Sequence, residues 1–367
     1  MKIKSGFTLN ELLVATVLIS IVGITAFTLF QTGDRHEARQ QDILQQNHNL
    51  RAALHVLARD IRMAGNGLNI IGADLFDIYV EAQYSDPEAH ENGSGWFKHI
   101  GSNLSGVRPI FSPEQTDSEI PDVFTIIYSS HENPLPIGRL EDSSPFSVGN
   151  DTSLWLQEPI SPGNQISDGH MIAVVNDNRA VILQASFDSG ANTYEIKIGD
   201  RHKPGSTLMT FPPGSQVYNL RDISFVTYYI NNVTQRLMAN HHYAIVPGAT
   251  EPHLISIASN IENMKIAYIL ASLTNSAGPK PPTNINPLEA LDRTINDGVL
   301  EDKAICMANI SLLSHSIRPN KMGPSTETIC WPGSTICYTT PNDGHTRRKI
   351  SKNINIRNNS LGLCTAL

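Results

Sequence analysis

The first 64 residues carry two successive patterns of apolar positions, and both predict helix. Residues 12–30 are almost continuously apolar, and Glu11 is the only charged residue between Lys4 and Asp34. A helix of roughly 20 apolar residues is long enough to cross the hydrocarbon core of a bilayer. We therefore expect a membrane-length helix over residues 7–30, behind a short basic leader formed by residues 1–6.

The flanks of this segment predict its orientation and its retention. Lys2 and Lys4 are expected to hold the leader in the cytoplasm, because positive charge beside a membrane helix stays on that side. A secretory signal peptide would end in a small-residue cleavage site of the A-x-A kind, and none follows Phe30. The apolar segment is therefore expected to stay in the mature protein, with the rest of the chain exported.

Between residues 31 and 66 the pattern becomes amphipathic, which predicts that the same helix continues and packs on a globular domain. The apolar positions recur near helical spacing, at Ile43, Leu50, Leu54, Val56, Leu57 and Ile61. Arg59, Asp60 and Arg62 are expected on its solvated face. Glycine at Gly65 suits the left-handed cap that ends a helix. The whole rod would be on the order of 85 Å long at 1.5 Å per residue.

The remainder, residues 67–367, predicts a β-rich head. Gly, Ser, Asn and Pro are frequent in residues 68–121, which predicts a long loop region. Short runs rich in Val, Ile, Tyr and Phe follow and predict strands, at residues 122–129, 154–158, 170–176, 179–186, 194–199, 223–230, 236–239, 242–246, 264–271, 304–314 and 347–357. The predicted fold is α+β, with one long helix packed on an antiparallel-rich head.

Glu11 carries the most informative chemistry in the sequence. An ionisable group in a membrane segment costs about 2.5–3.5 kcal/mol on insertion scales, so it favours a partner. Cleavage after Gly6 would create one, because the new amino group of Phe7 is a cation at the same end of the helix. In an assembly, Glu11 of one subunit would pair with that amine on its neighbour. The alternative is a simple membrane anchor with its glutamate at the headgroup level.

The segment around Glu11 resembles the class III leader and methylation motif of type IV pilins and type II secretion pseudopilins. The matching residues are Ser5-Gly6-Phe7-Thr8-Leu9 and Glu11-Leu12-Leu13-Val14. The resemblance implies that a prepilin peptidase cuts between Gly6 and Phe7 and methylates Phe7, and that Glu11 serves assembly. Asn10 departs from the pattern, since the family usually has an aliphatic residue there.

A second stretch is similar to the end of the long helix in PilW-type minor pilins, whose relative is the J-type pseudopilin of type II secretion. It covers residues 57–65, with the sequence LARDIRMAG. Weaker matches follow in the same order, near residues 122–123 and at 169–185, 221–225, 260–264 and 304–314. The resemblance implies a non-enzymatic subunit that helps to prime or cap a pilus and thereby serves twitching, adhesion or DNA uptake.

The same resemblance implies partners and a location. The partners are other minor and major pilins, the prepilin peptidase and the inner-membrane assembly platform. The protein would sit in the inner membrane with a periplasmic head and then move to the filament, near its tip. Two alternatives remain: a pseudopilin of a type II secretion system, and a filament-borne or membrane-anchored adhesin module that binds a ligand through its head.

All four cysteines lie in the C-terminal part, residues 304–367. An even number in an exported region favours disulfides. Cys330 and Cys337 flank a turn-prone loop, which suggests a local bridge and leaves Cys306 for Cys364. Free thiols and a zinc site remain alternatives, and His315 and His345 are the candidate additional ligands for zinc.

Charge and motifs argue against other classes of function. The net charge is −8, and removing Lys2 and Lys4 with the leader takes it from −8 to −10, which does not favour direct nucleic-acid binding. The sequence has no G-x-S-x-G, P-loop or H-E-x-x-H motif. We therefore expect no catalytic residues, no cofactor and no functional metal.

Overall fold

The structure is a computed structural model of the chain. It describes residues 9–66, 68, 75–78, 104–107, 110–111, 121–129, 135–143, 145–147, 151, 153–160, 166, 170–176, 179–186, 194–198, 210–221, 223–241, 253–272, 303–317, 319, 326, 328–331 and 337–356.

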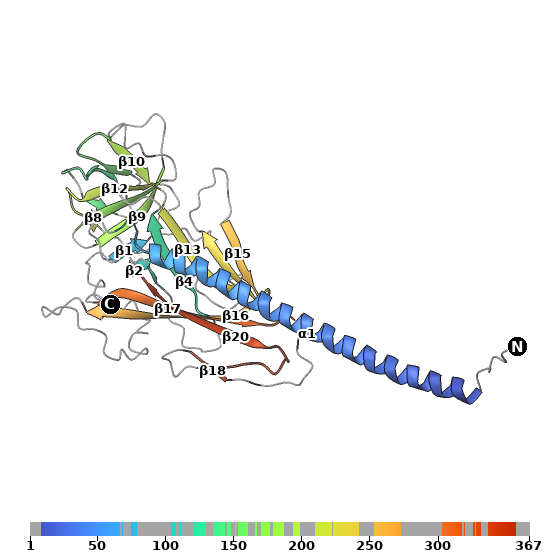
Figure 1. Cartoon of the computed structure of the whole chain (residues 1–367). Coiled ribbons are helices and arrows are strands. Elements are labelled where there is room, and N and C mark those ends of the chain that lie inside the picture. The colour runs from blue at the N-terminus through green and yellow to red at the C-terminus, as the bar shows by residue number, and fades with distance from the viewer. Residues whose placement is uncertain are drawn as a thin grey trace.

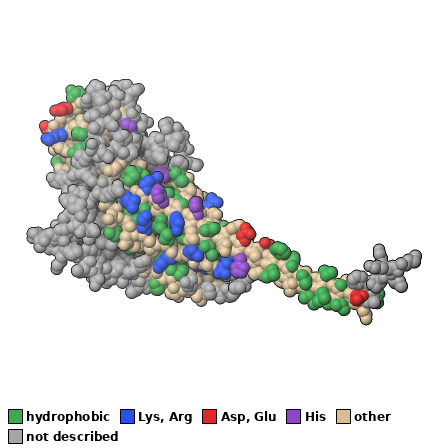
Figure 2. Space-filling view, in the orientation of Figure 1, with side chains coloured by type: hydrophobic (Ala, Val, Ile, Leu, Met, Phe, Trp, Pro, Cys, Tyr) green, Lys and Arg blue, Asp and Glu red, His purple; other side chains and the backbone are tan. Residues whose placement is uncertain are grey.

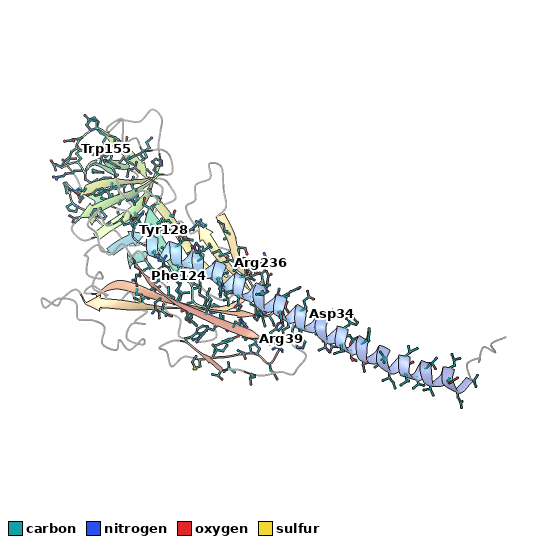
Figure 3. The ribbon with its side chains drawn as sticks, viewed as in Figure 1. Asp34, Arg39, Phe124, Tyr128, Trp155 and Arg236 are labelled. Atoms are coloured by element: carbon teal, nitrogen blue, oxygen red, sulfur yellow. A yellow bond between two sulfur atoms is a disulfide. The ribbon has the colours of Figure 1, made fainter. Side chains whose placement is uncertain are left out.

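One helix, α1 (Leu9–Met63), extends from the head as a straight rod (Figure 1). Its 55 residues make it about 82 Å long at 1.5 Å per residue. None of residues 9–45 is buried, whereas burial begins at Gln46 and continues to the end of the helix. We call residues 9–30 the apolar half, residues 31–45 the neck and residues 46–63 the head-bound half. Figure 3 shows Asp34 and Arg39 on the neck, outside the head.

The helix ends where the sequence predicts. Gly65 has a φ of 76°, a left-handed conformation that glycine accepts without the clash a Cβ would bring. Its amide donates to the carbonyl oxygen of Ile127 at 2.8 Å, and the Asn66 amide donates to the carbonyl of Met63 at 2.8 Å. The chain is thereby turned from the helix axis towards the sheets.

Three main sheets form the head, and all their strand pairs except β1 with β9 are antiparallel within the described residues. The distal sheet has the order β2-β1-β9-β8-β12-β5, with β10 paired to β9 and β7 paired to β10. Its strands are β1 (Leu75–Ile78), β2 (Leu104–Val107), β5 (Leu135–Arg139), β7 (Ser153–Trp155), β8 (Met171–Asn176), β9 (Arg179–Ser186), β10 (Glu195–Ile198) and β12 (Gln216–Arg221).

The other two main sheets lie closer to the helix. The proximal sheet has the order β15-β14-β13-β4-β3, and a three-stranded sheet has the order β16-β17-β20. Their strands are β3 (Ile110–Phe111), β4 (Phe124–Ser129), β13 (Ile223–Asn231), β14 (Arg236–His241), β15 (His253–Ser259), β16 (Ile261–Ser272), β17 (Lys303–His315) and β20 (Arg347–Asn355). Two small hairpins pair β6 (Phe146–Ser147) with β11 (Thr210–Phe211), and β18 (Thr328–Cys330) with β19 (Cys337–Thr339).

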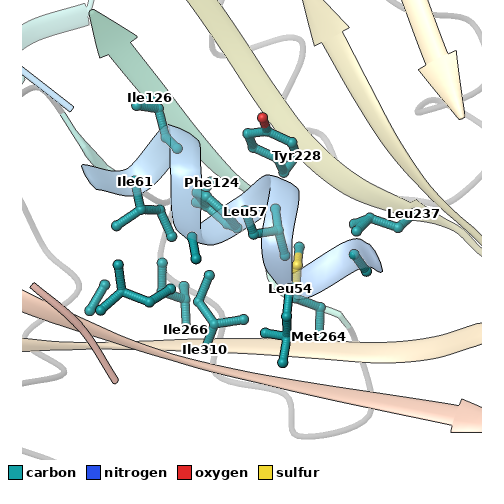
Figure 4. Packing of buried hydrophobic residues seen from close by; sticks show 14 of the residues in the cluster. Leu54, Leu57, Ile61, Phe124, Ile126, Tyr228, Leu237, Met264, Ile266 and Ile310 are labelled. Carbon is teal, nitrogen blue, oxygen red and sulfur yellow. The ribbon is translucent and has the colours of Figure 1, made fainter. Parts of the chain in front are cut away.

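The head-bound half of α1 lies between the proximal sheet and the three-stranded sheet (Figure 4). Leu54, Leu57 and Ile61 pack against Phe124 and Tyr228 of the proximal sheet, and the cluster continues into the three-stranded sheet through Met264, Ile266 and Ile310. Each large apolar side chain that is fully buried contributes about 1.5–3 kcal/mol. The helix is therefore part of the core of the head as well as its stalk.

Side chains point alternately to the two faces of the proximal and distal sheets, and this alternation packs the two sheets against each other. On the far face of the proximal sheet, Val123, Ile127 and Phe225 pack against Met171 and Ile182 of the distal sheet. The next residues of the distal strands, including Ile172 and Val181, face a third cluster farther from the helix. Both sheets are thus buried on two faces.

The predicted α+β fold is confirmed, and strands occupy most of the predicted runs, including β4, β8, β9, β13, β16 and β17. Three short strands, β1, β2 and β3, lie within residues 68–121, the predicted loop region. The predicted strand at residues 242–246 lies outside the described residues. The sequence did not indicate β5, β12 or β15.

Candidate assembly site on the long helix

The apolar half of α1 has exposed hydrophobic side chains all around the helix, and Figure 2 shows those on one side. Large apolar residues there are more than half exposed, namely Leu9, Leu12, Leu13, Val14, Val17, Leu18, Ile19, Ile21, Val22, Ile24, Phe27, Leu29 and Phe30. The segment is long and apolar enough to cross a membrane, and none of its most apolar window is buried by the rest of the chain. At about 33 Å for 22 residues it matches the ~30 Å hydrocarbon core.

The hydroxyl groups in this half are satisfied by the helix itself. Thr16 donates to the carbonyl of Leu13 at 2.9 Å, and Ser20 donates to that of Thr16 at 2.8 Å. Two further threonines of this half, Thr25 and Thr28, bond to carbonyls three residues earlier, and Thr32 at the start of the neck bonds to the carbonyl of Thr28. A lipid or helix-bundle environment requires such internal bonds, because it supplies no water to polar groups.

Glu11 lies in the first turn of α1 and carries the only charged side chain among residues 9–33. A carboxylate there is favoured by the partial positive charge at the N-terminal end of a helix. Gly6 and Phe7 lie outside the described residues, so cleavage and methylation stay predictions.

A buried polar cluster fixes the helix to the proximal sheet. The Tyr228 hydroxyl donates to Asp60 Oδ2, and Arg59 Nε donates to Asp60 Oδ1 at 2.6 Å. Asp60 is only 1% exposed, so the prediction that it lies on the solvated face is wrong, although Arg59 and Arg62 are exposed. A polar residue between Arg59 and Ile61 faces the core here because Tyr228 supplies a matching donor.

The ionisation behaviour of the cluster follows from its burial. Burial, and next the charge of Asp60, raise the pKa of Tyr228, so the phenol stays protonated and donates. The same two causes raise the pKa of Tyr128. The hydrogen bond to Asp60 raises the pKa of the Arg59 guanidinium. The arrangement holds one carboxylate with a phenol and a guanidinium, and it positions the helix.

Removing the phenol tests this anchoring role. Tyr228→Phe leaves Asp60 Oδ2 without this donor in a buried site, which typically costs about 1–3 kcal/mol. We expect the free energy of unfolding, measured by urea denaturation, to fall by that amount. An unchanged denaturation midpoint would contradict the anchoring role.

Polar side chains also hydrogen-bond the helix to the sheets where it enters the head. Gln46 donates through Nε2 to the carbonyl of Thr346 at 3.0 Å, and Asn49 donates to the carbonyl of Ser259 at 3.1 Å. Arg348 reaches Asn47 from β20 at 3.2 Å. The start of the head-bound half is therefore hydrogen-bonded both to the proximal sheet and to the segment of β20.

Cys330 and Cys337 form a disulfide with an S–S distance of 2.02 Å, across the β18–β19 hairpin. This is the local pair that the sequence suggests. Because these two sulfur atoms bond to each other, the zinc alternative that includes them is wrong. Cys364 lies outside the described residues, so its bridge to Cys306 stays a prediction.

The two candidate histidine ligands contact each other. The ring centroids of His315 and His345 are 5.1 Å apart, edge to face. Nδ1 of each lies within hydrogen-bond distance of the Ser316 carbonyl, at 2.8 and 2.6 Å. Within the described ranges, no group of three potential His, Cys, Asp or Glu ligands comes together. Their role here is to pair the ends of two chain segments.

An arginine clamp holds the disulfide hairpin to the three-stranded sheet. Arg347 binds Glu262 through Nε at 2.7 Å and Nη2 at 3.0 Å, and it binds Asp343 through Nη1 at 2.9 Å and Nη2 at 2.6 Å. Tyr338 of the hairpin donates to Glu262 at 2.7 Å. Bidentate pairs of this kind fix geometry as well as adding energy.

This clamp predicts a pH dependence. The hydrogen bond from Arg347 holds the pKa of Asp343 well below its usual range. A lowered folded-state pKa stabilises the fold above the unfolded-state value, and this stabilisation is lost as pH falls through the folded-state value. We expect the near-UV circular dichroism of Trp331 to weaken as the pH falls below about 4, where the carboxyl of Asp343 titrates in the unfolded chain. An Asp343→Asn variant should lack this acid transition; an identical transition in the variant would contradict it.

Comparisons with known proteins were made at the level of families, sequences and structures. The chain matches no protein-family model and no curated protein sequence. Among solved structures, it is similar to a type IV-like pilin from Thermus thermophilus, with 13% sequence identity over 52% of this chain and 85% of that one. The TM-score is 0.21, which does not establish a shared fold.

Proposed function

We propose that this chain is a minor pilin of a type IV pilus, of the PilW type, and that it acts as a structural subunit without enzymatic activity. The observation that carries the proposal is the division of α1. One half is exposed, apolar and charged only at Glu11, and the other half is built into the core of a β-rich head. The exposed apolar surface of such a helix is expected to be buried in lipid or against other helices.

In the proposed mechanism, the subunit waits in the inner membrane with its head in the periplasm. The prepilin peptidase removes residues 1–6 and methylates Phe7. Glu11 then pairs with the Phe7 amine of a neighbour while the apolar halves bundle into a filament core. A carboxylate in lipid is costly, whereas in the filament Glu11 would be paired with an amine. This difference favours extraction of the subunit from the bilayer.

The internal hydrogen bonds of the apolar half support this transfer. Thr16, Ser20 and Thr25 bond within their own helix and so need no new partner in either environment. Glu11, the only charged residue of the apolar half, is the group there whose electrostatic surroundings would change on assembly. Gln46 and Asn49 bind the helix to the head. The head would therefore move outwards with the helix to a position near the pilus tip.

Deletion of the gene in its native host tests the assignment to a pilus. We expect loss of surface pili, restored by the full-length chain but not by a chain in which the apolar half is replaced by a cleavable signal peptide. Retained pili with lost export of folded proteins would assign the chain to a type II secretion system. If both processes survive and only adhesion is lost, the head would be a ligand-binding module.

A further inference from the structure

An exposed tryptophan of the distal sheet lies between two glutamates on the neighbouring strands. Trp155, in β7, is 44% exposed. Glu195 lies directly opposite it in the antiparallel pair of β7 with β10. On the other side, the Glu141 amide donates to the Trp155 carbonyl at 2.9 Å, beside the antiparallel bridge of Leu140 with Leu156. Residues directly opposite each other in a sheet share a face. The side chains of residues 141, 155 and 195 therefore form one row, which we call the Trp155 row.

The other face of these strands belongs to the core and so fixes the position of the Trp155 row. Four residues that alternate with members of the row are buried in one cluster, namely Leu140, Leu154, Leu156 and Ile196. Successive side chains of a strand point to opposite faces. Burial of these four residues therefore turns the Trp155 row towards solvent.

The stability of the sheet does not explain the Trp155 row. Singly exposed apolar side chains are common on protein surfaces. On a strand, an aromatic side chain gains stability from an aromatic or β-branched residue directly across, yet both cross-strand neighbours of Trp155 are glutamates. The backbones of Glu141 and Glu195 lie two strand spacings apart, which is about 10 Å. The ion pairs of the described part of the chain involve neither glutamate.

The positive side chains of the same face lie outside the Trp155 row. Lys197 is opposite Ser153 on one side of the row, and the amide of Gln157 donates to the carbonyl of Arg139 on the other side. Each of these cations is two residues from the row, which is about 7 Å along a strand. The row itself therefore holds an aromatic ring and two carboxylates, and its charge favours a cationic ligand.

We propose that the Trp155 row binds a protonated amino sugar. The sugar ring lies against the indole of Trp155, and its ammonium and hydroxyl groups donate hydrogen bonds to Glu141 and Glu195. A cation near the indole face is attracted by the quadrupole of the ring. A quaternary ammonium ligand gains the same attraction but has no hydrogen to donate, whereas the row offers an acceptor on each side of the ring. Acidic sugars are disfavoured, because their charge has the same sign as that of the row.

The position of the Trp155 row also favours a saccharide over a lipid headgroup. Figure 3 shows Trp155 on the opposite side of the head from Asp34 of the neck, and Figure 1 shows β10 in the same region. With the apolar half in a bilayer, the row lies far from the headgroups of that bilayer. Binding itself does not require that the chain belongs to a pilus.

Calorimetric titration of the full-length chain tests the proposal, in a polyoxyethylene detergent that has no sugar headgroup. The probe is a glucosamine tetramer at about pH 6, where amines are protonated. The neutral probe is the N-acetylated tetramer. One variant carries Glu141→Gln and Glu195→Gln. The control variant carries Glu37→Gln and Glu158→Gln, two exposed glutamates outside the row, so both variants change the net charge equally.

We expect the wild-type chain to bind the cationic tetramer about tenfold more tightly than the neutral one. The variant without the two carboxylates should lose this preference, and the control variant should keep it. The preference should also shrink when sodium chloride rises from about 0.05 M to about 0.5 M, because exposed charges are screened. Trp155→Ala should weaken binding of both tetramers about tenfold, because both stack on the indole.

Three results would overturn the proposal: equal affinities of the wild-type chain for the two tetramers, an unchanged preference without Glu141 and Glu195 carboxylates, or an equal loss in the control variant. Tighter binding of choline than of the cationic tetramer would overturn the choice of an amino sugar. Gene deletion reports the proposed function separately. Loss of pili on deletion without binding by the purified chain leaves the pilus assignment standing and removes the ligand. Binding with pili retained on deletion does the reverse.

Discussion

Replacing Glu11 with glutamine is expected to reduce incorporation of the subunit into filaments by about 70-fold, which corresponds to about 2.5 kcal/mol. The variant has no charge at position 11. The subunit then loses the electrostatic cost of holding a carboxylate in the membrane, and it also loses the gain from pairing that carboxylate with the Phe7 amine of a neighbour. Processing should persist, because Gly6 and Phe7 are unchanged. Immunoblots of sheared pili and of membranes measure the two quantities.

Glu37→Gln is the matched control. Glu37 is exposed on the same helix, but it lies on the neck outside the apolar half. Its neutralisation should leave incorporation within about twofold of the wild type, as expected for an exposed surface charge. Normal piliation with Glu11→Gln, or equal losses with both variants, would contradict the pairing mechanism.

The second large effect concerns the attachment of the rod to the head. Leu57 is fully buried between the proximal and three-stranded sheets. Truncation to alanine removes its contacts and leaves a cavity that two sheets cannot readily close, so we expect a loss of about 3 kcal/mol, within the range of ~2–5 kcal/mol for such changes. Urea denaturation of the full-length chain in detergent, followed by tryptophan fluorescence, measures it.

Leu44→Ala is its control, because the residue type and helix are the same while the side chain is 67% exposed. The change should alter the free energy of unfolding by no more than about 0.5 kcal/mol. Similar losses for both variants would show that the helix is stabilised by its own propensity instead of by the head.

The long helix was predictable because its signals are local. A continuous apolar run, an amphipathic continuation and a glycine cap are all readable from neighbouring residues, and Gly65 adopts the expected left-handed conformation. The strands β8 and β9 were readable for the same reason, since both are rich in Val, Ile and Ala and are buried on both faces. The two strands pair antiparallel, with Asn176 opposite Arg179.

The errors have a common physical origin in contacts between distant segments. Asp60 looks solvated beside Arg59 and Arg62, yet Tyr228, 168 residues later, donates to it in the core. In the same way, β1 lies in a polar stretch and becomes a strand by pairing in parallel with β9. Local composition contains neither partner.

The candidate site also has features that neighbouring residues predict and features that depend on distant segments. The exposure of the apolar half, and the fact that Glu11 is its only charged residue, follow from the sequence. The clamp of Arg347 on Glu262 and Asp343 does not, because its members come from separate segments.

The most direct test of the central claim is the intact mass of the membrane-extracted protein from cells with and without prepilin peptidase, measured reduced and unreduced. The account predicts loss of residues 1–6 and one added methyl group on Phe7 only when the peptidase is present. An uncut N-terminus in both strains would contradict assignment to the pilin assembly class and leave a membrane-anchored periplasmic protein.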